Sequence, residues 1–111
     1  MNTTKDSLKD IRELLTDETK WTKGESARDA KGGRTHPRSE TAASFCLIGA
    51  CIHVGGGNGE FVRNALVDQI KLADIDGERG NTSIVYFNDH KTTSHADVLA
   101  VLDAAIAAEE G

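Results

Sequence analysis

Two cysteines and a histidine stand in the apolar run SFCLIGACIHV. Such side chains could bind a metal ion, or a thiolate could act as a nucleophile beside the imidazole. Cys46 and Cys51 lie five residues apart, whereas a structural zinc site needs cysteines two to four residues apart and a second pair. A nucleophilic thiol also needs an electropositive, partly exposed setting, which a buried helix does not provide. We therefore expect no metal site, and interpret both cysteines as core residues and His53 as the surface end of a helix.

Two further motifs resemble ligand-binding loops. GGGNGE, which begins at Gly55, lacks the strand that precedes the glycines of a nucleotide-binding fingerprint, and Glu60 stands where the third glycine should be. We interpret it as a linker between helices. DIDGE, which begins at Asp74, starts like a calcium loop, but Arg79 replaces the required glycine and Val85 the closing glutamate. Neither motif predicts a cofactor, and we expect none.

Asn88 and Asp89 belong to the stretch YFNDHKTTSH, which combines amide, carboxylate and imidazole side chains. They follow an expected strand and precede an expected helix, where side chains either bond their own backbone or project into a cleft. One interpretation is a turn that leads into the helix cap. The other is a site in which Asp89 faces a cation from Arg28 or Arg34, with His90 as a further titratable group. Both interpretations stay open at this point.

The charge of the chain is unevenly distributed. From Lys20 to Arg38 there are six basic and two acidic residues, a local charge of +4, while the whole chain has a net charge of −5. The rest of the chain is therefore strongly acidic and repels a phosphate backbone. The basic segment also contains one aromatic residue, Trp21, where a nucleic-acid binder would normally interleave several. We do not expect the protein to bind nucleic acid.

Four segments have the pattern of helices, and they run from about 5 to 17, 39 to 54, 59 to 74 and from 94 onward. The first and third are amphipathic, and the last is expected to bury a row of apolar residues from Val98 to Ile106. The second has no polar face and is expected to be the buried centre of the domain. Ser39 is expected to cap the second helix and Gly55 to end it. Ser94 and Asp97 have the spacing of a capping box at the start of the last helix.

A long loop at 19–38 and a short extended segment complete the chain. The segment SIVYF at 83–87 is β-branched and aromatic, which is typical of a strand. Its available partner is a hairpin around DAKGGR, before Pro37. Trp21 is expected to pin the long loop to the core, because burying its large ring stabilises the fold by several kcal/mol.

Length and composition fit one globular domain over residues 1–111. Hydrophobic residues make up 38% of the chain and charged residues 28%, so disorder is not expected. The N-terminal stretch lacks the apolar core of a signal peptide, and no run of about 18 apolar residues predicts a membrane span. The two cysteines suit a reducing compartment, so we expect the protein to be cytoplasmic.

Several short motifs occur in an order that resembles a known family. They are Trp21, ARD at Ala27 to Asp29, Gly32, Pro37, FCLIGA at Phe45 to Ala50 and SIVYFND at Ser83 to Asp89. Together they resemble a family of small uncharacterised bacterial and phage proteins that is known only as a domain of unknown function. The family usually has tryptophan where this chain has Phe87, which keeps an apolar side chain but removes an indole donor. The resemblance implies the fold and boundaries and no activity.

The sequence thus predicts a mainly α, small helical domain of about four helices around a buried central helix, with a minor short β-pair. The expected function is that of a small cytoplasmic binding or regulatory protein that acts through residues 21–38 and the turn at Asn88 and Asp89; the sequence does not identify its partner, for which a protein is one candidate. The candidate binding residues, in the long loop and the expected turn, are Trp21, Arg28, Asp29, Asn88, Asp89 and His90. The alternative is a small enzyme or ligand-binding domain that uses Arg28 and Asp89. The oligomeric state is left open.

Overall fold

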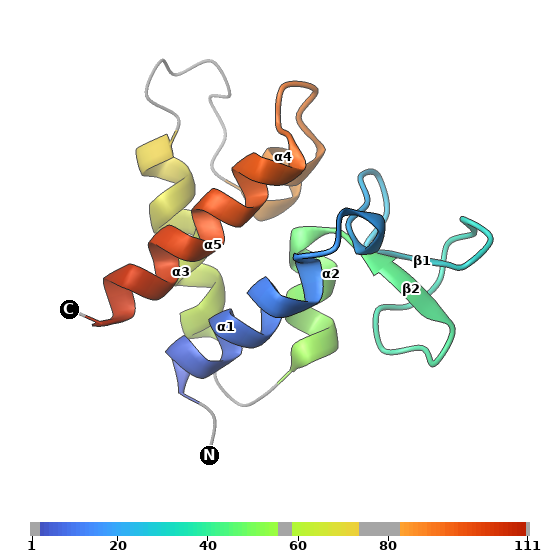
Figure 1. The fold of residues 1–111 in the computed structure, drawn as a ribbon, viewed down its shortest axis with the longest axis horizontal. Helices are drawn as coiled ribbons and strands as arrows, with labels where there is room; N and C mark the ends of the chain where they lie inside the picture. The colour runs from blue at the N-terminus through green and yellow to red at the C-terminus, as the bar shows by residue number, and fades with distance from the viewer. Residues whose placement is uncertain (1–2, 56–58, 74–82, 111) are drawn as a thin grey trace.

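The chain forms five α-helices, one 3₁₀ turn and one pair of strands within residues 3–55, 59–73 and 83–110, which a computed structural model describes. The elements are, in chain order, α1 (Thr4–Leu15), η1 (Glu18–Lys20), β1 (Ala27–Asp29), β2 (Ala42–Phe45), α2 (Leu47–Val54), α3 (Gly59–Ala73), α4 (Ile84–Asp89) and α5 (His95–Glu110) (Figure 1). This architecture confirms the predicted mainly α class with a minor strand pair. Most of the glycine-rich linker, at 56–58, and the segment 74–82 lie outside the described residues.

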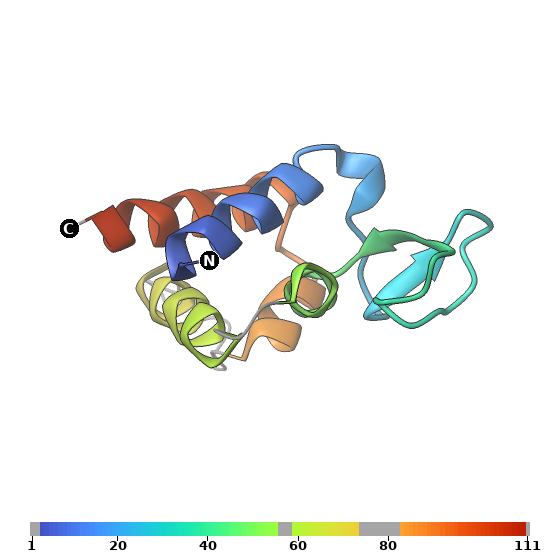
Figure 2. The same cartoon turned by 90° about the horizontal axis from the view of Figure 1, so that it is seen from below.

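The helices form two layers, and the strand pair projects from one side of them (Figure 2). α1 and α5 lie side by side in one layer, and α2, α3 and α4 lie in the other. The shortest dimension of the molecule, 21 Å, fits two layers of helices packed about 10 Å apart. All five α-helices contribute to the core, and one large buried residue from each is Leu8, Leu47, Leu66, Phe87 and Leu102.

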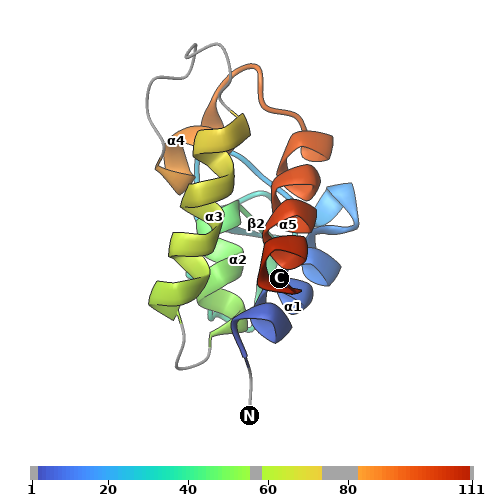
Figure 3. The ribbon, with the colours of Figure 1, turned by 90° about the vertical axis from the view of Figure 1, so that its left-hand side faces the viewer.

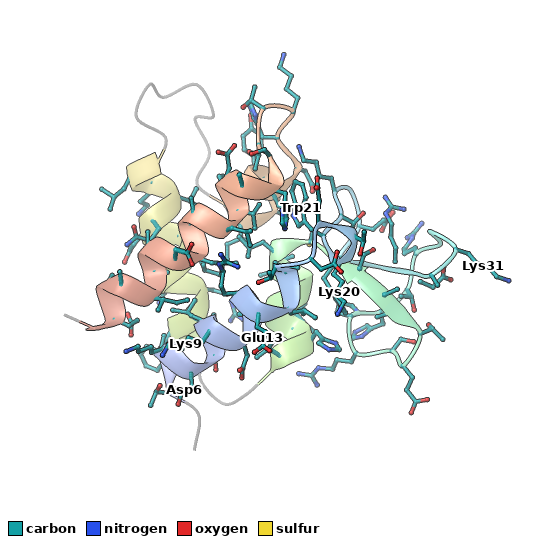
Figure 4. All side chains as sticks on the ribbon, viewed as in Figure 1. Asp6, Lys9, Glu13, Lys20, Trp21 and Lys31 are labelled. Carbon is teal, nitrogen blue, oxygen red and sulfur yellow. The ribbon has the colours of Figure 1, made fainter. Side chains whose placement is uncertain are left out.

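The helices α1 and α5 form where the sequence predicts them. In α1, Leu8 is buried, while Lys9 and Glu13 are exposed and point away from the core (Figure 4). At the start of α5, Ser94 and Asp97 form the predicted capping box: Ser94 Oγ accepts a hydrogen bond from Asp97 N at 3.1 Å, and Asp97 Oδ2 accepts one from Ser94 N at 2.9 Å. No helix among the described residues has the length and apolar character needed to cross a membrane.

α3 has the predicted bounds, but its apolar residues are not all buried. Leu66 and Ile70 face the core, and α3 runs beside α5 on the side of the molecule seen in Figure 3. Phe61 and Leu72, which the pattern places on the apolar half, are instead 65% and 70% exposed. They lie on nearly the same side of the helix, because eleven residues turn it through about three full turns.

The first half of the predicted central helix is a strand. β2 pairs with β1 in antiparallel register, with Ala27 opposite Phe45. The long loop therefore supplies one strand of a pair, as predicted, but its partner is β2 and not the segment SIVYF. The pairing satisfies backbone groups of both strands and overrides the helix propensity of Ala42 and Ala43.

The helix α2 begins at Leu47, later than predicted, because Cys46 is its cap. Cys46 Sγ accepts a hydrogen bond from Gly49 N at 3.3 Å. Ser39, the predicted cap, lies in a turn in which its Oγ accepts a hydrogen bond from Thr41 N at 3.2 Å. The predicted central segment is therefore not one continuous helix, and it is buried mainly from Phe45 to Ala50, whereas His53 near its end is exposed.

The long loop approaches α2 so closely that one helix position has no room for a side chain. A Cβ at Gly49 would overlap the carbonyl oxygen of Ser26 and lie 2.7 Å from its carbonyl carbon. The same oxygen accepts a hydrogen bond from Cys46 N at 3.2 Å. Glycine thus allows the loop backbone to reach the first turn of α2.

The prediction that SIVYF forms a strand is wrong, because residues 84–89 form the helix α4. Ser83 caps this helix, and its Oγ accepts a hydrogen bond from Tyr86 N at 3.0 Å. The buried residues of α4 have helical spacing, and they are Ile84, Phe87 and Asn88. Burial of this one side overrides the β propensity of the segment.

Candidate functional site

Asn88 lies at the centre of a hydrogen-bond network that joins three parts of the chain. Its side chain is completely buried. Asn88 Oδ1 accepts hydrogen bonds from Trp21 Nε1 at 2.6 Å and from Leu47 N at 3.0 Å, and Asn88 Nδ2 donates to Thr22 O at 3.0 Å. We call these four residues the Asn88 junction. It fixes the long loop to α4 and to the first turn of α2.

Trp21 pins the long loop, as predicted. Its ring packs against the core and lies 5.8 Å from the ring of His95, at the start of α5 (Figure 4). Lys23 Nζ lies 5.6 Å from the centre of the Trp21 ring and donates a hydrogen bond to His90 O at 2.7 Å. The indole is therefore held by its N–H group, by apolar packing and by a cation above its face.

Arg28 holds the long loop together from within. Arg28 Nε donates to Thr22 Oγ1 at 2.9 Å, Nη2 to Lys23 O at 3.0 Å and Nη1 to Gly32 O at 3.1 Å. The described hydrogen bonds of Arg28 all go to groups of the long loop, and no ion pair with Asp89 is among the described contacts. Three charge-assisted hydrogen bonds within the loop give Arg28 a structural role.

Asp89 lies at the edge of the Asn88 junction and is exposed. Its Oδ1 accepts hydrogen bonds from Gly24 N at 3.0 Å and from Asn88 Nδ2 at 2.9 Å. The interpretation of Asn88 and Asp89 as a turn is wrong, because both residues lie at the end of the helix α4. The other candidate cation, Arg34, has Glu25 as its partner at 3.5 Å.

Two hollows adjoin Asp89 on the surface. The larger has a volume of 450 Å³ and is lined by residues of α4 and its ends, with Val85, Tyr86 and His90 among them. The smaller has a volume of 220 Å³ and lies where Gly24 to Ser26 approach Cys46, Ile48 and α4. Val85 and Asp89 line both hollows, so the two are adjacent.

Four of the six predicted site residues lie outside the Asn88 junction, and two of these, Asp29 and His90, shape neighbouring turns. Asp29 Oδ1 accepts hydrogen bonds from the backbone N–H groups of Lys31 and Gly33, each at 2.9 Å. It therefore shapes the tip of the loop, where Lys31 points away from the body (Figure 4). His90 Nδ1 accepts a hydrogen bond from Thr92 N at 3.2 Å, which shapes the connection to α5. Of the six candidates, the structure brings Trp21, Arg28, Asn88 and Asp89 together, and His90 contributes a backbone carbonyl beside them.

Sequence reasoning missed the exposed apolar side chains of α4. Val85 is 50% exposed and Tyr86 is 40% exposed, whereas a buried strand would cover at least one of them. The signal that could have found them is the spacing of Ile84, Phe87 and Asn88, which follows the period of a helix. The backbone groups of Thr22 and Gly24, which bind Asn88 and Asp89, carry no signal in the sequence.

The two cysteines are unpaired and occupy different environments. Cys46 is 3% exposed, and burial raises the pKa of its thiol, with a smaller contribution from the Asp89 carboxylate. Burial also raises the pKa of the Cys51 thiol, to about 12. Among the described residues no group of histidine, cysteine and carboxylate side chains could hold a metal ion. Raised thiol pKa values disfavour the thiolate, so both cysteines fit packing better than nucleophilic chemistry.

The raised pKa of Cys51 predicts a loss of stability in alkali. The folded protein keeps this proton up to a pKa of about 12, whereas the unfolded thiol releases it near the ordinary value of 9.0. Above about pH 9 the unfolded state binds fewer protons, so the free energy of unfolding should fall by up to roughly 1.4 kcal/mol per pH unit from this group. Urea unfolding followed by Trp21 fluorescence measures the slope. The variant Cys51→Ala should give a shallower slope, and an identical slope would contradict the prediction.

Comparison with known proteins gives one match. A family described as a family of unknown function, DUF6197, matches residues 1–108. No curated protein and no solved structure matches the chain. The match covers almost the whole chain and supplies no activity, so the function has to be argued from the site itself.

Proposed function

The chain belongs to the DUF6197 family, a family of unknown function, and we propose that it is a small binding or regulatory protein that docks a protein partner beside the Asn88 junction. The docking face consists of Val85, Tyr86 and Asp89 on α4 and of residues 24–26 of the long loop. We place this activity in the cytoplasm, which the two unpaired cysteines support. The family resemblance further suggests a bacterial or phage origin.

The observation that carries the proposal is the contrast between the two sides of α4. Asn88 is completely buried and bonded to two other segments, the long loop and α2, while Val85 and Tyr86 on the same short helix are 50% and 40% exposed. Apolar and aromatic side chains that are exposed beside hollows are typical of interaction surfaces. A rigid support reduces the entropy that such a surface loses on binding.

The alternative, an enzyme that uses Arg28 and Asp89, has less support. A catalytic acid or base needs a partner that sets its protonation and a substrate position beside it. The three nitrogens of Arg28 bind groups of the long loop, and Asp89 Oδ1 binds Gly24 N and Asn88 Nδ2. These contacts fit a structural role for both side chains better than a catalytic one.

Nucleic-acid binding by the basic loop also has less support. Of the six cations between Lys20 and Arg38, Lys23 and Arg28 bind carbonyl groups of the protein. Arg34 lies beside Glu25. The loop therefore offers a phosphate backbone fewer cations than its composition suggests, and the rest of the chain is acidic.

Site-specific photocrosslinking in the cells that express the protein tests the proposal. A photoreactive phenylalanine analogue in place of Tyr86 should crosslink a discrete partner, and the additional change Val85→Ser should abolish the product. The matched control places the same analogue at Phe61, an aromatic residue of α3 that is 65% exposed. Absence of a product at position 86, or the same products from positions 61 and 86, would contradict the proposal.

A further inference from the structure

The docking face combines apolar surface with the carboxylates of Asp89 and Glu25. From this combination, and resting on the proposed function, we infer that the partner presents a lysine or arginine next to an apolar side chain. The apolar part of the face is formed by Val85, which lines both hollows, and by Tyr86 in the larger, and Ile48 lines the smaller hollow beside it. An aliphatic side chain of the partner can cover Val85 and fill either hollow.

The negative part of the face consists of two carboxylates. Both described hydrogen bonds to Asp89 fall on Oδ1, and among the described contacts no donor reaches Oδ2. Glu25 lines the smaller hollow together with Asp89. Its described ion pair is with Arg34 at 3.5 Å, and the Arg34 side chain is 78% exposed. Because this ion pair is so exposed, it contributes little to stability. A cation of the partner can replace Arg34 beside Glu25 and at the same time bind Asp89 Oδ2.

Two loop cations near the docking face, Lys23 and Arg28, are engaged by other groups of the protein. Lys23 Nζ donates to His90 O at 2.7 Å and lies above the Trp21 ring, and Arg28 binds the loop at three points. Lys91 is exposed, but it is not among the residues that line either hollow. The acidic remainder of the chain adds attraction at longer range. Charge complementarity therefore favours a basic segment over an acidic one.

Selection from a random heptapeptide library displayed on phage tests the inference. Panning against the wild-type protein should enrich peptides in which lysine or arginine adjoins an aliphatic residue. Synthetic versions of the enriched peptides should bind the Asp89→Asn variant at least about tenfold more weakly than the wild-type protein. They should bind the control variant Leu72→Ser, which is altered on another helix, with the affinity of the wild-type protein. Replacing the arginine of such a peptide by citrulline, its neutral analogue, should weaken binding to wild type by the same factor and leave binding to Asp89→Asn unchanged.

The outcomes separate this inference from the proposed function. Enrichment of acidic or uncharged peptides that lose binding in Val85→Ser would overturn the inference and leave the docking face intact. Peptides that bind the Val85→Ser variant with the same affinity as the wild-type protein would count against both the inference and the proposed docking face. Absence of any enrichment would overturn the inference, while the photocrosslinking result at position 86 decides the proposed function independently.

Discussion

Replacing Gly49 with alanine is expected to lower the free energy of unfolding by more than about 3 kcal/mol. The new methyl group would overlap the carbonyl oxygen of Ser26; its position is fixed by the helix backbone, and the carbonyl is itself backbone, so neither can rotate away. Relief requires the long loop to move off α2, which breaks the hydrogen bond from Cys46 N to Ser26 O. Because the loop is also fixed by the Asn88 junction, a local shift would disturb Trp21 as well. Urea unfolding measured by circular dichroism gives the free energy directly.

The variant Gly59→Ala is the matched control for this prediction. Gly49 and Gly59 both lie in helices, where propensity alone favours alanine over glycine by about 1 kcal/mol. A Cβ at Gly59 would meet the end of the flexible Arg63 side chain at 3.2 Å, and that side chain can move aside. We therefore expect Gly59→Ala to be neutral or stabilising. Equal stability of both alanine variants would contradict the close approach of the loop to α2.

The substitution Asn88→Asp is expected to cost more than about 3 kcal/mol although it changes one atom of the side chain. The carboxylate could still accept from Trp21 Nε1 and Leu47 N, but it would lose the donation from Nδ2 to Thr22 O. It would also place a buried oxygen against Thr22 O and against the Asp89 carboxylate, which now accepts from Asn88 Nδ2. Unpaired negative charge in a buried position is strongly unfavourable.

The reverse exchange one residue later, Asp89→Asn, is the control. Asn at this position keeps an oxygen that can accept from Gly24 N and from Asn88 Nδ2, so its effect on stability should be below about 1 kcal/mol. The cost of Asn88→Asp should also shrink toward about pH 4, because protonation removes the buried charge. Thermal unfolding of the three proteins at neutral and acidic pH tests both statements. Similar stabilities for the two variants at neutral pH would contradict the role of Asn88.

The sequence predicts the helices whose apolar spacing and capping residues are sufficient to determine a helix. α1, α3 and α5 have an apolar stripe and, in α5, a capping box, and each forms close to its predicted bounds. The pattern is less informative for the outer residues of α3, because Phe61 and Leu72 are apolar and exposed. Periodicity indicates which residues could be buried, but neighbouring elements determine which of them are.

The two wrong assignments concern short segments whose conformation depends on distant partners. Ala42 and Ala43 favour a helix, yet they lie in a strand because β1 offers a partner for their backbone. Residues 84–89 favour a strand, yet they form a helix because Ile84, Phe87 and Asn88 are buried on one side of it. Such tertiary effects are not visible in a local window of sequence.

The sequence predicts which segments of the candidate site lie together better than it predicts the contacts of their side chains. The sequence indicates that the long loop and the residues around Asn88 belong together, and the contacts of Trp21, Thr22 and Gly24 with α4 support this. It also suggests that Arg28 faces Asp89, whereas Arg28 binds the carbonyl groups of Lys23 and Gly32. A side chain whose type suggests catalysis can thus serve instead to hold a loop that has few apolar residues to stabilise it.

Hydrogen exchange of the Trp21 indole N–H group tests the account most directly. If Trp21 Nε1 donates to the buried Oδ1 of Asn88, exchange requires that the loop separates from α4 and α2. We predict that this proton exchanges as slowly as the most protected backbone amides of the α1 and α5 core, and that Asn88→Ala removes the protection. An indole proton that exchanges in the wild-type protein at the rate of free tryptophan would contradict the Asn88 junction and the rigid docking face that depends on it.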